Sequence, residues 1–243
     1  MLRSRYIPAL TLLNEGLIKT RGFKKYKYVG DPVNVIKIFN EKRVDELAIY
    51  DISPDFSRAI NFDLLAKIAR EANMPLCYGG RVSSAEEASR LVKLGFEKVS
   101  VSRLFFKSPS EVSRMSQMIG SQSVVVTLDV KDALLSGWNL FSDNGKNRQR
   151  VSLEAALTSA AEVGVGEICI QNITRDGSRE GYDMKLVEFV MARTNCPVTI
   201  LGGCSGPGDM ANLNNKYGPI GIGASAEYVL TGKHDAVLIT YHR

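Results

Sequence analysis

The chain has 243 residues, of which 44% are hydrophobic and 23% charged, and its formal net charge is +5. This length suits two small domains or one large one, and the composition is that of an ordinary globular protein. No apolar run approaches the roughly 18 residues of a membrane span, and the N-terminus lacks the features of a secretory signal. We therefore expect a cytoplasmic protein without a membrane partner.

Histidine and cysteine are scarce. The two histidines, His234 and His242, both lie near the C-terminus, which disfavours a histidine-rich zinc site or a Ser-His-Asp hydrolase. No CxxC spacing occurs, and three of the cysteines sit in or beside apolar runs, so we expect buried, reduced thiols rather than a metal site. The four are Cys77, Cys169, Cys196 and Cys204. Nothing in the sequence implies a metal or an organic cofactor.

Eight short apolar segments follow one another along the chain. They are rich in Val and Ile and apolar at both odd and even positions, which is the pattern of parallel strands buried on both faces. The segments begin at Arg5, Glu46, Pro75, Lys98, Ser123, Glu167, Pro197 and Ile220.

Helical spacing of apolar residues separates these strands, and several of the helices start with Ser, Asp or Asn in a capping position. The expected helices cover 31–44, 61–73, 83–96, 108–120, 152–165 and 183–194, with a weaker helix, broken by Gly and Asn, over 206–218 and a short last unit over 225–243. Eight strand-helix units predict one (β/α)8 barrel, a TIM barrel, over residues 1–243. A doubly wound open sheet is the alternative, but no G-x-G-x-x-G follows the first strand.

The chain also repeats itself at half its length. Gly79-Gly80 after the third strand matches Gly202-Gly203 after the seventh, and "VSVS" of the fourth strand matches "GIGAS" of the eighth. Leu10-Thr11 of the first strand corresponds to Leu128-Asp129 of the fifth. We interpret these pairs as two similar half-barrels.

One basic segment, "KTRGFKKYKYVGDP" from Lys19, interleaves lysines with aromatic residues. Such interleaving occurs in nucleic-acid binding, but the segment is short and lies between elements of an enzyme scaffold. A loop over an anionic small molecule is the preferred interpretation, a solvated surface is the second, and no nucleic-acid partner is expected.

In a barrel of this kind the active site lies where the C-terminal ends of the strands meet. Glycines after the seventh and eighth strands suit phosphate binding, because bare backbone N–H groups and a helix N-terminus can approach an anion there. Tight strand-helix turns would also need these glycines. The strand-end residues are Thr11, Asp51, Gly80, Arg81, Ser102, Asp129, Asn172, Gly203 and Ser225.

Several motifs spread over nearly the whole chain carry a resemblance to one family. They are "GDPV", "VDELAIYDI", "EKVSVS", "VVVTLDVK" followed by a "GWNLF" hairpin, "ILGGCSGP" and, most specific, "RDGSREGYD" from Arg175 to Asp183. The sequence resembles HisF, the cyclase subunit of imidazole glycerol phosphate synthase.

The resemblance implies a glutaminase partner that releases ammonia below the barrel, and an ammonia entrance gated by charged residues at the N-terminal ends of the strands. The matching residues are Arg5, Glu46, Lys98 and Glu167. Two charges of each sign around one opening can form an ion-pair ring, which four like charges could not. Ordinary polar strand starts are the alternative.

At the top of the barrel, the resemblance implies two catalytic aspartates, after the first and fifth strands. Asp129 matches one, whereas Thr11 occupies the place of the other. A threonine hydroxyl does not titrate near neutrality, so it cannot replace a carboxylate in acid-base catalysis.

The resemblance also implies two phosphate sites. In the first, around Gly80, Arg81 stands where the family has a third glycine and Ser102 where it has an asparagine; Arg81 or Arg103 could grip an anion by its side chain. The family also has a lysine in a loop near this site, and Lys19 matches it. The second phosphate site matches the family at Asp176, Gly177, Gly202, Gly203, Ala224 and Ser225.

The sequence combines the loss of the first aspartate with a retained ammonia entrance. In this combination it resembles HisF-like paralogues that are encoded with surface-polysaccharide genes. We therefore expect a synthase-type subunit of a glutamine amidotransferase complex, a heterodimer with a HisH-like glutaminase that passes ammonia towards a sugar amidotransferase. A true cyclase of histidine biosynthesis, in which Asp129 acts with water or a loop residue, is the alternative. A third possibility is a non-catalytic barrel that binds a phosphorylated small molecule or activates its glutaminase.

Overall fold

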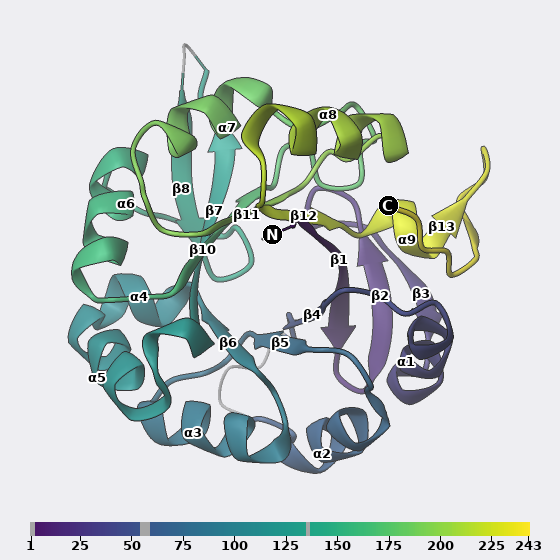
Figure 1. The fold of residues 1–243 in the computed structure, drawn as a ribbon, viewed down its shortest axis with the longest axis horizontal. Helices are drawn as coiled ribbons and strands as arrows, with labels where there is room; N and C mark the ends of the chain where they lie inside the picture. Colours follow the sequence, from purple (N-terminus) through teal and green to yellow (C-terminus); the bar gives the residue numbers. More distant parts are fainter. Residues whose placement is uncertain (1–2, 54–58, 135–136) are drawn as a thin grey trace.

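Eight parallel strands close on themselves into a barrel, and the helices lie around its outside (Figure 1). Pairing of the fifth barrel strand with the sixth completes the circle. This computed structural model describes residues 3–53, 59–134 and 137–243. It confirms the predicted (β/α)8 fold. Around the barrel the strands are β1 (Arg5–Leu13), β4 (Leu47–Asp51), β5 (Leu76–Gly79), β6 (Lys98–Val101), β7 (Val124–Asp132), β10 (Glu167–Asn172), β11 (Val198–Leu201) and β12 (Gly221–Ala224).

The helices begin where the sequence offers caps. Five of them start behind an Asp, Asn or Ser whose side chain accepts a hydrogen bond from a backbone N–H of the first turn, as their capping positions predict. The helices are α1 (Pro32–Glu41), α2 (Phe62–Glu71), α3 (Ala85–Leu94), α4 (Arg103–Lys107), α5 (Pro109–Ile119), α6 (Leu153–Glu162), α7 (Met184–Met191), α8 (Pro207–Tyr217) and α9 (Ala226–Val229), with a short 3₁₀ helix at Ser121–Ser123.

The expectation that helix 206–218 is broken is wrong, because α8 runs unbroken for 11 residues. Pro207 starts it, and Met210 and Leu213 bury one face against the barrel. A Cβ at Gly208 would meet no atom within 4 Å, so the glycine destabilises the helix only through its low helix propensity. Packing of one apolar face therefore outweighs the weak local signal.

Two antiparallel hairpins extend the barrel strands on the side where the C-terminal strand ends lie. Strands β2 (Gly16–Thr20) and β3 (Tyr26–Gly30) follow β1, while β8 (Trp138–Ser142) and β9 (Asn147–Arg148) follow β7 and confirm the predicted "GWNLF" hairpin. The basic segment is thus not a loop, as expected from its composition, but half of a β-hairpin. A small two-stranded sheet, β13 (Leu230–Thr231) with β14 (Ala236–Val237), lies near the C-terminus.

The two half-barrels have matching backbones. The structure shifts the predicted glycine pairing by one residue, because Gly80, with φ of +105°, corresponds to Gly202, with φ of +101°, rather than to Gly203. A Cβ at Gly80 would lie 2.2 Å from the carbonyl oxygen of Asp51, and one at Gly202 would lie 2.5 Å from that of Asn172. Ser102 and Ser225 precede short helices with φ, ψ of −121°, −65° and −119°, −69°. A side chain cannot occupy either glycine position, so the internal repeat extends to backbone geometry.

The residues that the structure describes form two apolar cores. The larger lies between the strands and the surrounding helices. The smaller fills the barrel interior and is called here the lumen cluster: Ile7, Ala9, Ala48, Cys77, Val125, Cys169 and Leu201, with Tyr50 packed against it. Cys77, Cys169 and Cys204 are buried free thiols, as predicted, and Cys196 is partly exposed.

Candidate functional site

A cavity of about 620 Å³ opens at the C-terminal ends of the barrel strands. It is called here the upper cavity. All the predicted catalytic and phosphate-binding residues line it, although they come from eight separate stretches of the chain. These residues are Thr11, Lys19, Gly80, Ser102, Asp129, Asp176, Gly177, Gly202, Gly203, Ala224 and Ser225.

Asp129 lies on β7 with only 8% of its surface exposed. Burial raises the pKa of its carboxyl group to about 7, although Lys131 and the Ser102 hydroxyl act in the opposite direction. The negative charge of Asp176 adds to the increase. A carboxyl group with this pKa can both take and return a proton near neutral pH.

Thr11 lies on β1, is partly exposed and lines the same cavity. Asp129 therefore shares the cavity with the hydroxyl group of Thr11, at the position where the family resemblance leads us to expect a second aspartate. A hydroxyl can hydrogen-bond a ligand, but it cannot hold a charge at neutral pH.

Lys19 and Asp176 lie 157 residues apart and form a buried ion pair, with 2.7 Å between Nζ and Oδ1. Thr20 donates a hydrogen bond of 3.0 Å to the other oxygen of the same carboxylate. Lys19 is therefore not a loop lysine, as the sequence suggested, but a buried residue of β2. The pair fastens the β2–β3 hairpin to the segment after β10.

The two predicted phosphate positions differ at Arg81 and Gly203. Gly203 has φ of +103°, and a Cβ there would lie 2.3 Å from the carbonyl oxygen of Gly181. At the equivalent point of the first half, Arg81 also has a left-handed φ of +66°, which favours glycine. Both Arg81 and Arg103 line the cavity, and Arg103 is paired with Asp143 at 3.3 Å. The first position is therefore bulkier and more cationic than the second.

Two strand-end residues support the structure around the cavity. Asp51 accepts hydrogen bonds from the Tyr78 hydroxyl at 3.2 Å and from the backbone of Ser53 at 2.9 Å. Asn172 lies outside the cavity lining, where its amide donates a bond of 3.2 Å to Asp132. Both side chains hold neighbouring segments in place.

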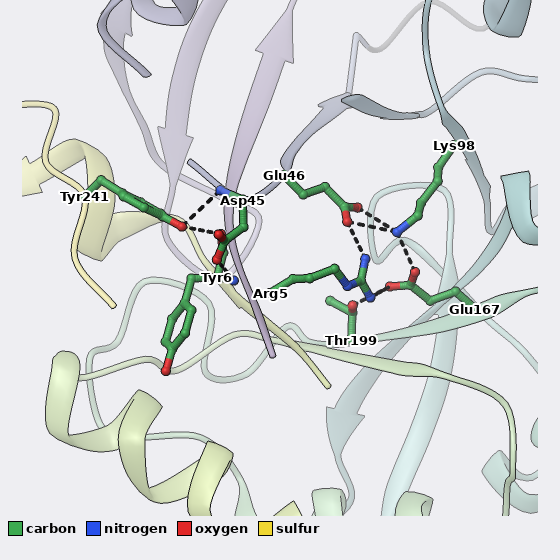
Figure 2. Close-up of polar contacts among 8 residues, drawn as sticks. All are labelled: Arg5, Tyr6, Asp45, Glu46, Lys98, Glu167, Thr199 and Tyr241. Carbon is green, nitrogen blue, oxygen red and sulfur yellow. Dashed lines mark hydrogen bonds and ion pairs between the residues drawn. The ribbon is translucent and has the colours of Figure 1, made fainter. Parts of the chain in front are cut away.

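At the opposite end of the barrel, four charged residues form a closed ion-pair ring (Figure 2). Lys98 bridges the two glutamates at 2.9 Å from Glu46 and 2.8 Å from Glu167. Arg5 also contacts both, with 3.0 Å to Glu167 and a closer approach to Glu46. The four predicted residues are therefore brought together, and each cation satisfies both anions.

The charges of the ion-pair ring stabilise one another. Burial alone would raise the pKa of Glu167, but Lys98 and Arg5 outweigh it and the pKa is lowered. Burial would likewise lower the pKa values of both cations, yet the glutamates raise them. Thr199 also donates a hydrogen bond to Glu167. Thr199 was not among the predicted residues, although its place at the second position of β11 was a usable signal.

Beside the ion-pair ring, the C-terminal segment is fastened to the starts of β1 and β4 (Figure 2). The Tyr241 hydroxyl accepts a hydrogen bond from the backbone of Asp45 and donates one to the carbonyl of Tyr6, both at 3.1 Å. The Asp45 side chain accepts a third from the Tyr6 backbone at 3.1 Å. These contacts fix the backbone that carries Arg5 and Glu46.

Within the described ranges, no helix is both long and apolar enough to span a membrane. The same residues hold no group of three or more His, Cys, Asp or Glu side chains placed to bind a metal ion.

Comparison with known proteins places these features in context. The chain matches the family model described as "Histidine biosynthesis protein" over residues 5–232. It is 40% identical to the "Putative imidazole glycerol phosphate synthase subunit HisF" of Leptospira borgpetersenii, over 99% of this chain and 96% of that protein. It is 41% identical to the "Putative imidazole glycerol phosphate synthase subunit hisF3" of Vibrio vulnificus, over 99% and 94%. The "Imidazole glycerol phosphate synthase subunit HisF" of Lactococcus lactis is 31% identical, over 89% and 84%.

Proposed function

Because the chain belongs to the HisF family of imidazole glycerol phosphate synthase subunits, we propose that it accepts ammonia from a HisH-like glutaminase and passes it through the barrel. The ion-pair ring is the entrance, and the partner docks on the face that surrounds it. The ammonia serves the amidination of a surface-polysaccharide sugar by a separate amidotransferase rather than the synthesis of histidine.

The combination of an intact ion-pair ring with Thr11 at the first catalytic position supports this proposal. The entrance retains all four charges in mutual contact. The upper cavity holds the carboxyl group of Asp129 and the hydroxyl of Thr11, which does not titrate near neutral pH and so cannot replace a second carboxylate. Delivery of ammonia needs the entrance and an open path, whereas ring closure needs both acids.

The second candidate is a true cyclase. Asp129 favours it, because a carboxyl group with a pKa of about 7 can serve as acid and base in turn. The Lys19–Asp176 pair and the glycines of the second phosphate position would then hold the substrate.

Turnover of the histidine-pathway ribonucleotide separates the two candidates. The purified chain is supplied with this ribonucleotide and excess ammonium salt, without a glutaminase, so that free ammonia bypasses the entrance. We expect no turnover by the wild type, and a Thr11→Asp variant tests whether the missing acid is the cause. Turnover by the wild type at the rate of an authentic cyclase would refute the proposal and establish the second candidate.

Coupling tests the entrance itself. In the complex with its glutaminase and a sugar amidotransferase, Lys98→Met should let ammonia leak, so that glutamine is hydrolysed without matching product. A barrel that only activates the glutaminase would keep hydrolysis and product in step.

A further inference from the structure

Tyr50 crosses the interior of the barrel. It lies on β4, and its hydroxyl is 3.7 Å from the Sγ of Cys169 on β10. In the order of the eight strands, β4 and β10 are four places apart, so they stand on opposite walls. The side chain therefore spans the lumen from one wall to the other, and it does so between the ion-pair ring and the upper cavity.

The upper cavity ends at this level. Tyr50, Ser100 and Thr127 line it, whereas the lumen-cluster residues Cys77 and Cys169 lie outside its lining. These two thiols are only 4% and 1% exposed. The ion-pair ring lies beyond them, because Lys98 and Glu167 are the first residues of β6 and β10, and Glu167 precedes Cys169 by two residues on the same side of its strand. A molecule that travels from the ring to Asp129 must therefore pass the Tyr50 side chain.

The sequence makes room for this arrangement at Gly79. A Cβ at position 79 would lie 2.8 Å from Cδ1 of the Tyr50 ring and 3.1 Å from the Cβ of Ser100. The φ of Gly79 is not in the left-handed region, so its backbone would accept alanine. The space above Gly79 is thus occupied by the tyrosine ring, and the absence of a side chain there lets the ring lie against β5.

Within the part of the chain that the structure describes, the Tyr50 hydroxyl contacts one uncharged polar group, and two further hydroxyl groups lie on the adjacent wall of the barrel. Ser100 and Thr127 share a hydrogen bond of 2.6 Å on the adjacent wall, and the Cys169 thiol contacts the hydroxyl itself. Hydroxyl and thiol groups can exchange hydrogen bonds with a small neutral molecule. An ion would lose part of its hydration at this level, where no charged side chain of the described residues contacts the Tyr50 hydroxyl, and this loss disfavours its passage.

We propose that Tyr50 is an inner gate of the barrel: its side chain closes the lumen between the ion-pair ring and the upper cavity, and it admits a small neutral hydrogen-bonding molecule such as ammonia while excluding ions. This inference rests on the proposed function for the identity of the molecule that passes through the barrel. The closure itself depends only on the geometry of the chain.

Thiol labelling of the isolated protein tests the gate. Methyl methanethiosulfonate, which is small and neutral, is added to the wild type, Tyr50→Ala and Tyr50→Phe, and modification of each cysteine is followed by peptide mass spectrometry. We expect Cys77 and Cys169 to react about tenfold faster or more in Tyr50→Ala, because reactivity follows access. Tyr50→Phe keeps the ring across the lumen and should remain close to the wild type.

Controls separate gating from unfolding. Cys196, which lies outside the lumen, should react at the same rate in all variants, and Tyr28→Ala provides a matched loss of an exposed tyrosine. Gly79→Ala retains the Tyr50 hydroxyl but pushes the ring aside, so it should also speed labelling of Cys77. If Cys77 and Cys169 react at wild-type rates in both Tyr50→Ala and Gly79→Ala, the inner gate is refuted.

The choice between neutral and charged molecules is tested with 2-(trimethylammonium)ethyl methanethiosulfonate on Tyr50→Ala. We expect this cation to label Cys77 about tenfold more slowly than the neutral reagent, after correction for their rates with Cys196. Equal corrected rates would overturn the selectivity. Because labelling needs neither glutaminase nor acceptor, failure of the gate is distinct from failure of ammonia delivery, which the coupling experiment with Lys98 detects.

Discussion

The two ends of the barrel treat charge in opposite ways. At the N-terminal end, two cations and two anions are arranged so that each cation contacts both anions. At the C-terminal end, Asp129 is buried and its pKa is raised to about 7, so its charged form is poorly compensated. At the N-terminal end, the charges are therefore neutralised by one another without a ligand. In the upper cavity, the negative charge of Asp129 is not neutralised by an ion-pair partner among the described residues, and binding of a proton or a cationic group would stabilise it.

Removal of a ring cation should have the largest effect. Lys98→Met leaves Glu46 and Glu167 with Arg5 alone, and we expect a loss of about 3 kcal/mol in unfolding free energy at pH 8. Urea unfolding measures it, with the exposed Lys93→Met as the control. Because the pKa of Glu167 is lowered in the folded protein, its contribution is present above the unfolded pKa and fades as the pH falls through the folded one. A loss of stability that does not diminish in acid would contradict the ring as its source.

Neutralisation of the upper carboxyl group should have an effect of similar size and opposite sign. The pKa of Asp129 is raised from 3.8 to about 7, so its ionisation opposes folding increasingly between these two values and constantly above them. Asp129→Asn should therefore stabilise the protein by about 2–4 kcal/mol at pH 8 and by almost nothing near pH 4. Thermal unfolding across this pH range checks the prediction, with the exposed Asp63→Asn as a control that should show no such trend.

Substitution of Arg81 should have the smallest effect on the free energy of unfolding. Arg81 has φ of +66°, and glycine would remove the strain of a side chain in that conformation. We expect Arg81→Gly to be about 0.5–1 kcal/mol more stable than Arg81→Ala, which lacks the arginine contacts but keeps the strain. The difference between the two urea midpoints isolates the backbone, and equal midpoints would show that position 81 is not strained.

The sequence predicted most of the barrel because its eight strands are short, apolar and regularly separated by capped helices. The ion-pair ring was also predictable, since each charged residue stands immediately before or at the start of a barrel strand. The β2–β3 hairpin was not, because β2 is fixed by pairing with β1 while the exposed lysines and tyrosines of β3 conceal its strand pattern. Lys19 was misplaced for the same reason.

The sequence predicted which residues line the upper cavity, but not which of them contact one another. The pairing of Lys19 with Asp176 joins residues 157 positions apart, which no local pattern encodes. Tyr50 could have been found, because Glu46, Ala48 and Tyr50 alternate along one strand and must face the same side. Its contact with Cys169 needed the closed barrel, since only closure fixes which walls are opposite.

The repeated half-barrels bear on how a ligand is oriented. Two matching halves give the upper cavity an approximate twofold axis, so a molecule with two similar anionic ends could be seated in either direction. Arg81 and Gly203 occupy equivalent points of the two halves, and only one of them carries a side chain. This difference, like the one between Thr11 and Asp129, removes the orientational degeneracy, because the two ends of the ligand no longer meet the same surface. The side chains of the barrel can thereby select one orientation of the ligand, which its nearly symmetric backbone alone cannot do.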